Sequence, residues 1–255
     1  MDRVSPQDGL ALVTGASSGI GRGVALELAR RGWIVAAVAR RAGELDKLAA
    51  EAPGKVFACA GDVTDRPGMA ALVAAVERAH GPIALAFLNA GTYFPDGRGH
   101  VDAAAAMRTF EINVGGTLNC LDPLVAAMAA RGRGQIALNA SVAGYGGLPR
   151  AAAYGASKAA LINMAASLRF ALDPVGIRIQ VVNPGFVRTP LTGKNDFPMP
   201  FMLELEDAAR RICDGFARGG FEIAFPRRLA WLLKALNMLP YPLYFRLVAK
   251  ATGAK

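Results

Sequence analysis

The sequence predicts a single α/β domain built on a doubly wound parallel sheet, with helices on both faces. Short apolar runs of strand length carry no charge, as in Leu10–Val13, which is typical of strands buried on both faces. These runs alternate with Ala-rich stretches of helical period, without an internal repeat or a low-complexity linker. The length of 255 residues and the hydrophobic fraction of 53% suit one domain with a substantial core.

The turn after the first predicted strand is rich in glycine. Leu10–Gly21 reads LALVTGASSGIG, and apolar residues then repeat at helical spacing, at Val24, Ala25, Leu28 and Ala29. Glu27, Arg30 and Arg31 fall on the other faces of this expected helix. A helix start offers N–H donors and a positive dipole end, and glycine lets an anion approach the backbone. The pattern therefore predicts a Rossmann-like site for the pyrophosphate of a dinucleotide.

Six further apolar runs predict the other strands of the sheet. They are Ile34–Ala39, Val56–Ala60, Leu85–Asn89, Gln135–Asn139, Arg178–Asn183 and Glu222–Phe225. Helices are expected at Pro67–His80, Asp102–Ala130, Tyr154–Leu172 and about Glu204–Arg218. The expected helix at Asp102–Ala130 contains a polar residue and two glycines, at Asn113, Gly115 and Gly116, which predict a local kink there.

The positive charge is concentrated at the end of the chain. The formal net charge is +9, but no acidic residue follows Glu222, whereas six basic residues do: Arg227, Arg228, Lys234, Arg246, Lys250 and Lys255. The remaining 23 basic and 20 acidic residues nearly balance, so we expect no nucleic-acid partner for the main body.

Cysteine and histidine usage argues against a metal site. The three cysteines (Cys59, Cys120 and Cys213) are far apart and odd in number, which favours reduced thiols, and the chain has only two histidines. Met1–Gly9 is polar, which predicts no signal peptide, and no uncharged apolar run approaches the roughly 20 residues of a membrane span. We therefore expect a cytoplasmic location.

The residue after the second predicted strand indicates which dinucleotide binds. At this point an acid would hydrogen-bond the ribose 2′-hydroxyl of NAD, whereas an arginine would pair with the 2′-phosphate of NADP. The chain has Ala39 and then Arg40, with no acid. The pattern favours NADP(H) over NAD(H), although Arg40 could also be an ordinary surface arginine.

Several motifs together resemble the short-chain dehydrogenase/reductase family, in its shorter class of about 250 residues. The glycine turn has the spacing Thr14-Gly15-x-x-x-Gly19-x-Gly21, and Ser141 precedes a Tyr154-x-x-x-Lys158 motif by 13 positions. Asn113 lies upstream in a matching context. The resemblance covers about Leu10–Thr189, and its motifs occur in the family's order.

The resemblance implies a role for each matching residue. Ser141, Tyr154, Lys158 and Asn113 would be catalytic, with Asn113 helping to hold a water in a proton relay. The cofactor would contact Gly15, Ser17, Ser18, Gly19, Ile20, Gly21, Asp62, Val63, Asn89, Ala90, Gly91, Tyr154, Lys158, Pro184, Gly185, Val187 and Thr189, with Arg40 added by the argument above. One departure is Ser18, because NADP-dependent members often carry a basic residue there.

These residue types suit the reduction of a carbonyl compound. A tyrosine hydroxyl has a pKa near 10, and a nearby lysine cation is expected to lower that of Tyr154, so that it can act as a general acid or base. Ser141 would hydrogen-bond the substrate oxygen. We therefore expect an oxidoreductase that interconverts a secondary alcohol and a ketone or aldehyde with NADP(H). The alternatives are a non-catalytic dinucleotide sensor, a nucleotide-sugar epimerase, and a membrane- or partner-binding protein on the same fold.

The segment after the sixth predicted strand resembles a lid. It is rich in Pro, Phe and Met, and its apolar members Phe186, Leu191, Phe197, Met199, Phe201 and Met202 indicate an apolar substrate pocket or a lid packed on itself. We place this lid at about residues 186–220, within a catalytic domain of residues 1–226.

One face of the Tyr154–Leu172 helix predicts a homodimer or homotetramer. The side opposite Tyr154 carries Ala156, Ala160, Asn163 and Ser167, which are small and uncharged where a solvent-facing side would carry charge. The alternative is that the chain's own C-terminal tail covers this face.

Residues 227–255 form a basic amphipathic tail outside the family motifs. Leu229, Leu232, Leu233 and Leu236 share one side of an expected helix, and a second helix could start at Pro242. Basic amphipathic helices with Trp and Tyr can lie in a membrane interface, so peripheral membrane contact is one interpretation. The other, which we weight more heavily, is that both helices pack on the domain.

Overall fold

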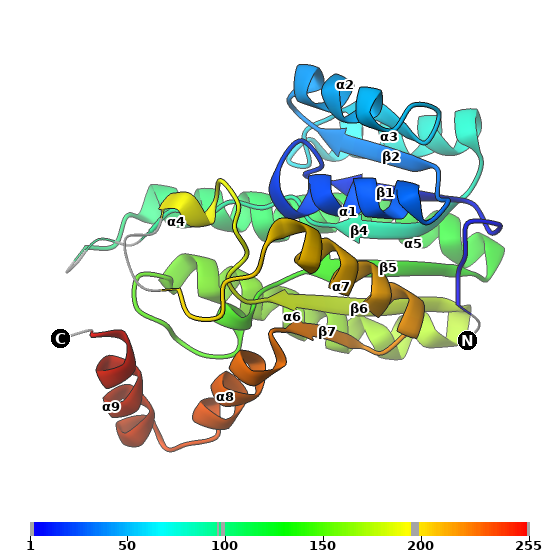
Figure 1. Cartoon of the computed structure of the whole chain (residues 1–255). Coiled ribbons are helices and arrows are strands. Elements are labelled where there is room, and N and C mark those ends of the chain that lie inside the picture. The colour runs from blue at the N-terminus through cyan, green and yellow to red at the C-terminus, as the bar shows by residue number, and fades with distance from the viewer. Residues whose placement is uncertain (1–2, 96, 98–99, 195–198, 254–255) are drawn as a thin grey trace.

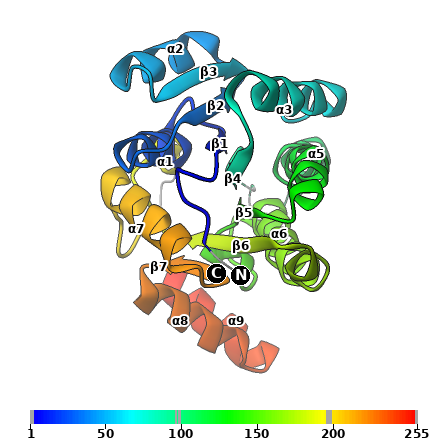
Figure 2. The same ribbon diagram turned by 90° about the vertical axis from the view of Figure 1, so that its right-hand side faces the viewer.

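The computed structural model describes residues 3–95, 97, 100–194 and 199–253. Its centre is a seven-stranded parallel sheet of order β3-β2-β1-β4-β5-β6-β7 (Figures 1 and 2). The strands are β1 (Leu10–Thr14), β2 (Val35–Ala39), β3 (Val56–Ala60), β4 (Ile83–Leu88), β5 (Gly134–Asn139), β6 (Ile177–Pro184) and β7 (Glu222–Phe225). The predicted fold class is confirmed, and each predicted strand agrees with its observed bounds to within two residues.

The helices form a layer on each face of the sheet. They are α1 (Gly19–Arg30), α2 (Ala42–Glu51), α3 (Arg66–His80), α4 (Ala103–Phe110), α5 (Gly116–Arg131), α6 (Ala152–Leu172), α7 (Leu205–Arg218), α8 (Arg227–Asn237) and α9 (Tyr241–Thr252). Helices α1, α2 and α7 contribute to the core on one face, and α3, α5 and α6 to the core on the other (Figure 2). Helix α2 was not among the predicted elements.

The order of the strands reverses at β1. This strand pairs with β2 on one side and with β4 on the other, both in parallel. In open parallel sheets such a reversal leaves a crevice beyond the carboxyl ends of the two strands, where ligands bind. The glycine turn after β1 lies at this point.

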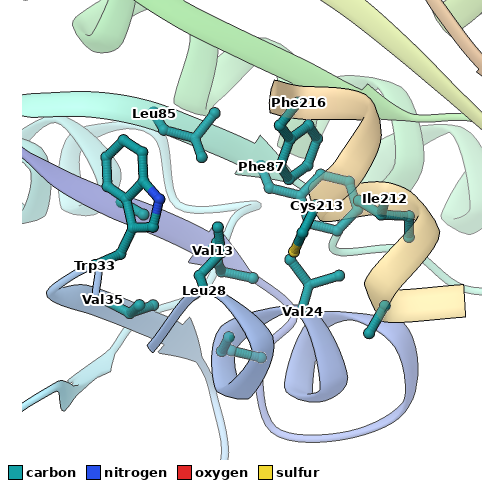
Figure 3. Packing of buried hydrophobic residues seen from close by; sticks show 14 of the residues in the cluster. Val13, Val24, Leu28, Trp33, Val35, Leu85, Phe87, Ile212, Cys213 and Phe216 are labelled. Atoms are coloured by element: carbon teal, nitrogen blue, oxygen red, sulfur yellow. The ribbon is translucent and has the colours of Figure 1, made fainter. Parts of the chain in front are cut away.

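The core beneath α1 and α7 is densely packed, as Figure 3 shows. Val13 of β1 and Phe87 of β4 are fully buried there, and the Phe87 ring meets the edge of Phe216 from α7 with 5.5 Å between centroids. Burial of such side chains stabilises the layer by roughly 1.5–3 kcal/mol each.

Helix α7 is part of the core, although it lies within the segment predicted as a lid. Ile212, Cys213 and Phe216 are buried against α1 and the sheet, so residues 205–218 pack as a core helix. Of the apolar residues predicted for the lid, Phe197 lies outside the described part of the chain.

Glu27 also departs from its expected place. It is only 6% exposed, although the pattern put it on a face of α1 away from the core. The guanidinium of Arg31 donates to Glu27 at 2.7 Å and reaches Asp214 of α7 at 2.8 Å. The buried carboxylate of Glu27 is tolerated because two guanidinium groups, those of Arg30 and Arg31, pair with it.

The long helix predicted at 102–130 is interrupted where the kink was expected. Helix α4 passes through a π turn at Glu111–Gly115 and then into α5. Asp102 begins the first part by accepting a hydrogen bond from the Ala105 N–H at 3.0 Å. π turns frequently occur at functional sites, and this one carries Asn113.

The C-terminal tail forms two helices joined by a short turn. Helix α9 begins at Tyr241, one residue before the predicted Pro242. Leu229 and Ala230 of α8, and Tyr244 and Val248 of α9, are buried against the domain. One side of the tail thus packs on the domain, and within the described residues no helix is both long and apolar enough to cross a bilayer.

Candidate active site

A cavity of about 410 Å³ opens at the carboxyl ends of the central strands. It is lined by the glycine turn after β1, the ends of β2 and β3, the loop after β4, Ser141, α6 and the segment after β6. Every predicted site residue lies in its wall except Gly21 and Asn113. The residues that the prediction missed include Arg41, Thr92, Ile112 and Asn139, together with Pro190 and Thr192.

Two glycines of the turn adopt a left-handed backbone. Gly15 has φ +67° and Gly19 has φ +54°, a conformation that L side chains rarely adopt. Gly21 serves packing instead, because a Cβ there would lie 2.5 Å from the Asn89 side chain and from the Gly15 carbonyl oxygen.

Asn89 connects the ends of three neighbouring strands. Its amide nitrogen donates to the Thr14 carbonyl at 3.0 Å, while its backbone N–H donates to the Thr14 hydroxyl at 2.9 Å. The Asn89 side-chain oxygen in turn accepts from Asn139 at 2.8 Å. This network fixes β1, β4 and β5 relative to one another at the floor of the cavity.

Ser141, Tyr154 and Lys158 converge on the cavity from two elements. Ser141 follows β5 and accepts a hydrogen bond from the Ala143 N–H at 3.1 Å, which fixes its hydroxyl, and that hydroxyl is hydrogen-bonded to Tyr154. Tyr154 and Lys158 lie one turn apart on α6. The Lys158 ammonium donates to the Asn139 carbonyl at 2.6 Å and lies 5.6 Å from the centroid of the Tyr154 ring.

Burial governs the titration of both α6 residues. It raises the pKa of Tyr154, and the hydrogen bond with Ser141 opposes that rise only in part. Burial also lowers the pKa of Lys158 to about 8. The expected lowering of the Tyr154 pKa is thus not seen in the chain by itself, where loss of solvation gives a net rise.

Asn113 lies behind the cavity wall and is fully buried. Its side-chain oxygen accepts from the Thr92 N–H at 2.7 Å, and its nitrogen donates to the Thr92 carbonyl at 3.1 Å and to the Ser157 hydroxyl at 3.0 Å. A Cβ on Gly91 would lie 3.2 Å from the Asn113 oxygen and 3.6 Å from the Lys158 ammonium. The side chain of Asn113 thus fixes the loop after β4 against α6.

Two adjacent arginines line the far end of the cavity. Arg40 is 64% exposed and lies 3.8 Å from the Asp62 carboxylate. Arg41 reaches back across the turn and donates to the hydroxyls of Ser17 and Ser18, each at 2.9 Å. The Arg41 guanidinium therefore lies beside Ser18, the position at which the sequence lacks a basic residue. The second arginine of the Arg40-Arg41 pair was the sequence signal that could have predicted this.

Asp62 is held by the turn that follows β3. Its carboxylate accepts from the Thr64 N–H at 3.0 Å and from the Thr64 hydroxyl at 2.9 Å. These hydrogen bonds, with help from Arg40, hold the pKa of Asp62 below its ordinary value. The side chain is thus a fixed acceptor at the edge of the cavity.

Comparison with known proteins gives consistent results. A family model described as short chain dehydrogenase matches residues 9–197. An uncharacterized oxidoreductase of Myxococcus xanthus is 38% identical over 237 residues, which cover 92% of this chain and 94% of that protein. A solved short-chain dehydrogenase from Streptomyces avermitilis has a TM-score of 0.81 at 26% identity, covering 97% and 96% of the two chains. Another, from Sphingobium yanoikuyae in complex with NADPH, has a TM-score of 0.79 at 30% identity and covers 90% and 92%.

A cavity at the strand reversal, with a glycine turn at one end and a Ser-Tyr-Lys group at the other, defines a dinucleotide-dependent oxidoreductase. The chain belongs to the short-chain dehydrogenase/reductase family, as its motifs predicted. Members of this family bind a nicotinamide dinucleotide and act on small molecules.

Proposed function

We propose that the chain interconverts a secondary alcohol and a ketone or aldehyde with NADP(H). The observation that carries this proposal is the convergence of Ser141, Tyr154 and Lys158 on a cavity that also contains the glycine turn. The residues present fit the dinucleotide, because hydroxyls, glycines and two guanidinium groups line the end of the cavity away from Tyr154.

Each side chain has a separate task in the proposed reaction. The nicotinamide, when bound, supplies the hydride that adds to the carbonyl carbon in reduction. The Tyr154 hydroxyl gives its proton to the carbonyl oxygen, and the Ser141 hydroxyl hydrogen-bonds that oxygen as its charge develops. The raised pKa of Tyr154 keeps it protonated at neutral pH, which suits a general acid. In alcohol oxidation the proton moves the other way.

Lys158 and Asn113 support Tyr154 in this proposal. The ammonium of Lys158 favours the phenolate that is left after proton transfer and holds the nicotinamide ribose. Asn113 keeps the loop after β4 in place next to Lys158, and it takes part in the proton relay that the family resemblance implies.

We further propose NADP(H) as the cofactor, held at its ribose phosphate by Arg40 and Arg41. Both side chains line the cavity directly after β2, and the sequence has no acid at that point to bind a ribose 2′-hydroxyl. Arginine pairs with phosphate through charge-assisted hydrogen bonds. The related Sphingobium yanoikuyae protein was solved with NADPH, which supports the same choice here.

The assembly and location that we propose are a homodimer or homotetramer in the cytoplasm. Ala156, Asn163 and Ser167 are exposed on α6, and α8 and α9 lie instead at the β7 end of the sheet (Figure 2). The uncharged face of α6 is thus open to a second copy rather than covered by the tail.

The decisive experiment replaces Tyr154 with phenylalanine. A panel of ketones and aldehydes of rising chain length is offered with NADPH, and cofactor oxidation is followed by absorbance. Tyr154→Phe should lower kcat by a factor on the order of 10²–10⁴ while NADPH binding is retained, because only the proton donor is lost. Tyr241→Phe, which removes a hydroxyl on the exposed side of α9, is the matched control. Full activity of Tyr154→Phe would refute the mechanism, and NADPH binding without turnover of any substrate by the unmodified chain would favour a sensor.

A further inference from the structure

The two tail helices and the turn between them carry several exposed apolar side chains. We call this set the tail patch, and it consists of Trp231, Leu232, Met238, Tyr241, Leu243 and Phe245. Met238 is 86% exposed, Tyr241 75% and Trp231 71%. Exposed apolar residues that gather in one region mark an interaction site more often than scattered ones do.

The fold of the tail does not depend on the patch. Helix α8 is held to the domain by buried Leu229 and Ala230, and Lys234 pairs with Glu222 of β7. Helix α9 is held by buried Tyr244 and Val248, and the Tyr244 hydroxyl donates to the Gly147 carbonyl at 2.8 Å. The patch is therefore an additional surface on helices that are already anchored.

Exposed positive charge lies on the same two helices as the tail patch. Arg227, Arg228, Arg246 and Lys250 are exposed on the same two helices, and none of them forms an ion pair with another described residue. The sequence has no acidic residue after Glu222. The surface of the tail thus combines cations with apolar and aromatic side chains.

The turn between α8 and α9 extends away from the sheet. In Figure 1 the two helices form a V at the lower edge of the molecule, and the turn that joins them is its lowest point. Met238 and Tyr241 flank this turn. A flat surface can approach the turn without displacing the core.

We propose that the tail docks on a membrane surface rich in anionic lipids, with the patch in the interface and the basic residues on the headgroups. Aromatic residues favour the interfacial region, and basic residues are attracted to anionic headgroups. A second copy of the chain would bring the same positive charge to the patch, whereas an anionic lipid surface complements it. The proposal is independent of the proposed reaction because binding is measured without substrate.

Co-sedimentation of the full chain with vesicles tests the proposal. The protein is expected to pellet with vesicles of phosphatidylcholine mixed with phosphatidylglycerol at low salt, and to bind pure phosphatidylcholine at least about tenfold more weakly. Added salt should release it, because screening weakens attraction between surface charges. Protein that stays in the supernatant with the anionic vesicles would overturn the proposal.

Paired variants separate the contributions of the patch and the charge. Tyr241→Asp with Phe245→Asp, and separately Arg228→Glu with Arg246→Glu, should each abolish pelleting while NADPH binding is retained. Met107→Asp is the matched apolar control, because Met107 is 69% exposed on α4, outside both the tail and the α6 face proposed as an interface. Lys55→Glu with Arg78→Glu is the matched charge control, since both side chains are exposed far from the tail. Tail variants that pellet like the unmodified protein would refute the proposal, and so would variants that only convert an oligomer to a monomer.

Tryptophan fluorescence tests the same idea without any substitution. The chain has two tryptophans, and Trp33 is only 6% exposed, so a response to vesicles reports on Trp231. Anionic vesicles should shift the emission to shorter wavelengths, and brominated lipid should quench it. An unchanged spectrum at saturating lipid would contradict docking through the patch.

Discussion

Replacement of Arg41 with alanine tests how the cavity distinguishes the two nicotinamide cofactors. The Arg41 guanidinium lies against the Ser17 and Ser18 hydroxyls at 2.9 Å, next to the predicted pyrophosphate turn. Its loss removes charged hydrogen bonds to the ribose phosphate, worth about 1.5–3 kcal/mol. NADPH should then bind roughly tenfold to a hundredfold more weakly. NADH lacks this phosphate, so its affinity should hardly change.

Arg40→Ala is expected to act in the same direction, with a loss of NADPH affinity at the lower end of that range. Arg40 is 64% exposed and lies 3.8 Å from the Asp62 carboxylate, whereas two serine hydroxyls hold the Arg41 guanidinium in place. Isothermal titration of each variant with NADPH and with NADH gives the four affinities that are needed. Arg41→Gln is the matched control, because a glutamine can still hydrogen-bond to the serines but carries no charge.

Two outcomes would refute this reasoning. The first is an equal loss of NADPH and NADH affinity in Arg41→Ala, with both affinities restored in Arg41→Gln. That result would mean that Arg41 only holds the glycine turn in place through its hydrogen bonds to the serines. A preference of the unmodified protein for NADH would mean that neither arginine reads a ribose phosphate.

Three other measurements address titration and assembly. The kcat/KM for NADPH should fall as pH rises through about 8, because Lys158 loses its proton there in the enzyme without cofactor. A kcat/KM that stays constant to high pH would contradict this. Burial alone would raise the pKa of Glu222, but hydrogen bonds from Lys234, Tyr145 and Asn183 lower it. The stability from this carboxylate is thus complete above its unfolded pKa of about 4.3 and is lost as pH falls through the lower folded value. Acid melts should show a smaller loss of stability in Glu222→Gln than in the unmodified protein; equal losses would be inconsistent with that account. Asn163→Arg on the exposed face of α6 should produce monomers in sedimentation velocity, and an unmodified monomer at micromolar concentration would refute that interface.

The sequence determined the fold class and most of the cavity wall because those features depend on local patterns. Apolar runs of strand length suit a sheet covered on both faces, and they predicted the seven strands that the structure describes. The glycine spacing fixed the turn after β1, and the four-residue step from Tyr154 to Lys158 placed both on one face of α6. The polar residue and glycines around Asn113 likewise predicted the interruption that became a π turn.

Only the tertiary structure decided which side chains meet. Of the two adjacent arginines, Arg41 reaches the serines and Arg40 lies near Asp62, a distinction that their neighbouring positions in the sequence do not make. Glu27 is buried on α1 with its carboxylate paired to Arg30 and Arg31, and Arg31 also reaches Asp214 of α7, a residue far away in sequence. Helix α7 belongs to the core because its apolar side packs against α1. The sequence prediction included this helix in the lid, since it directly follows the segment rich in Pro, Phe and Met. Local periodicity specifies which elements form, but the partner of a buried charge or an apolar face comes from a distant segment, and only the folded chain brings the two together.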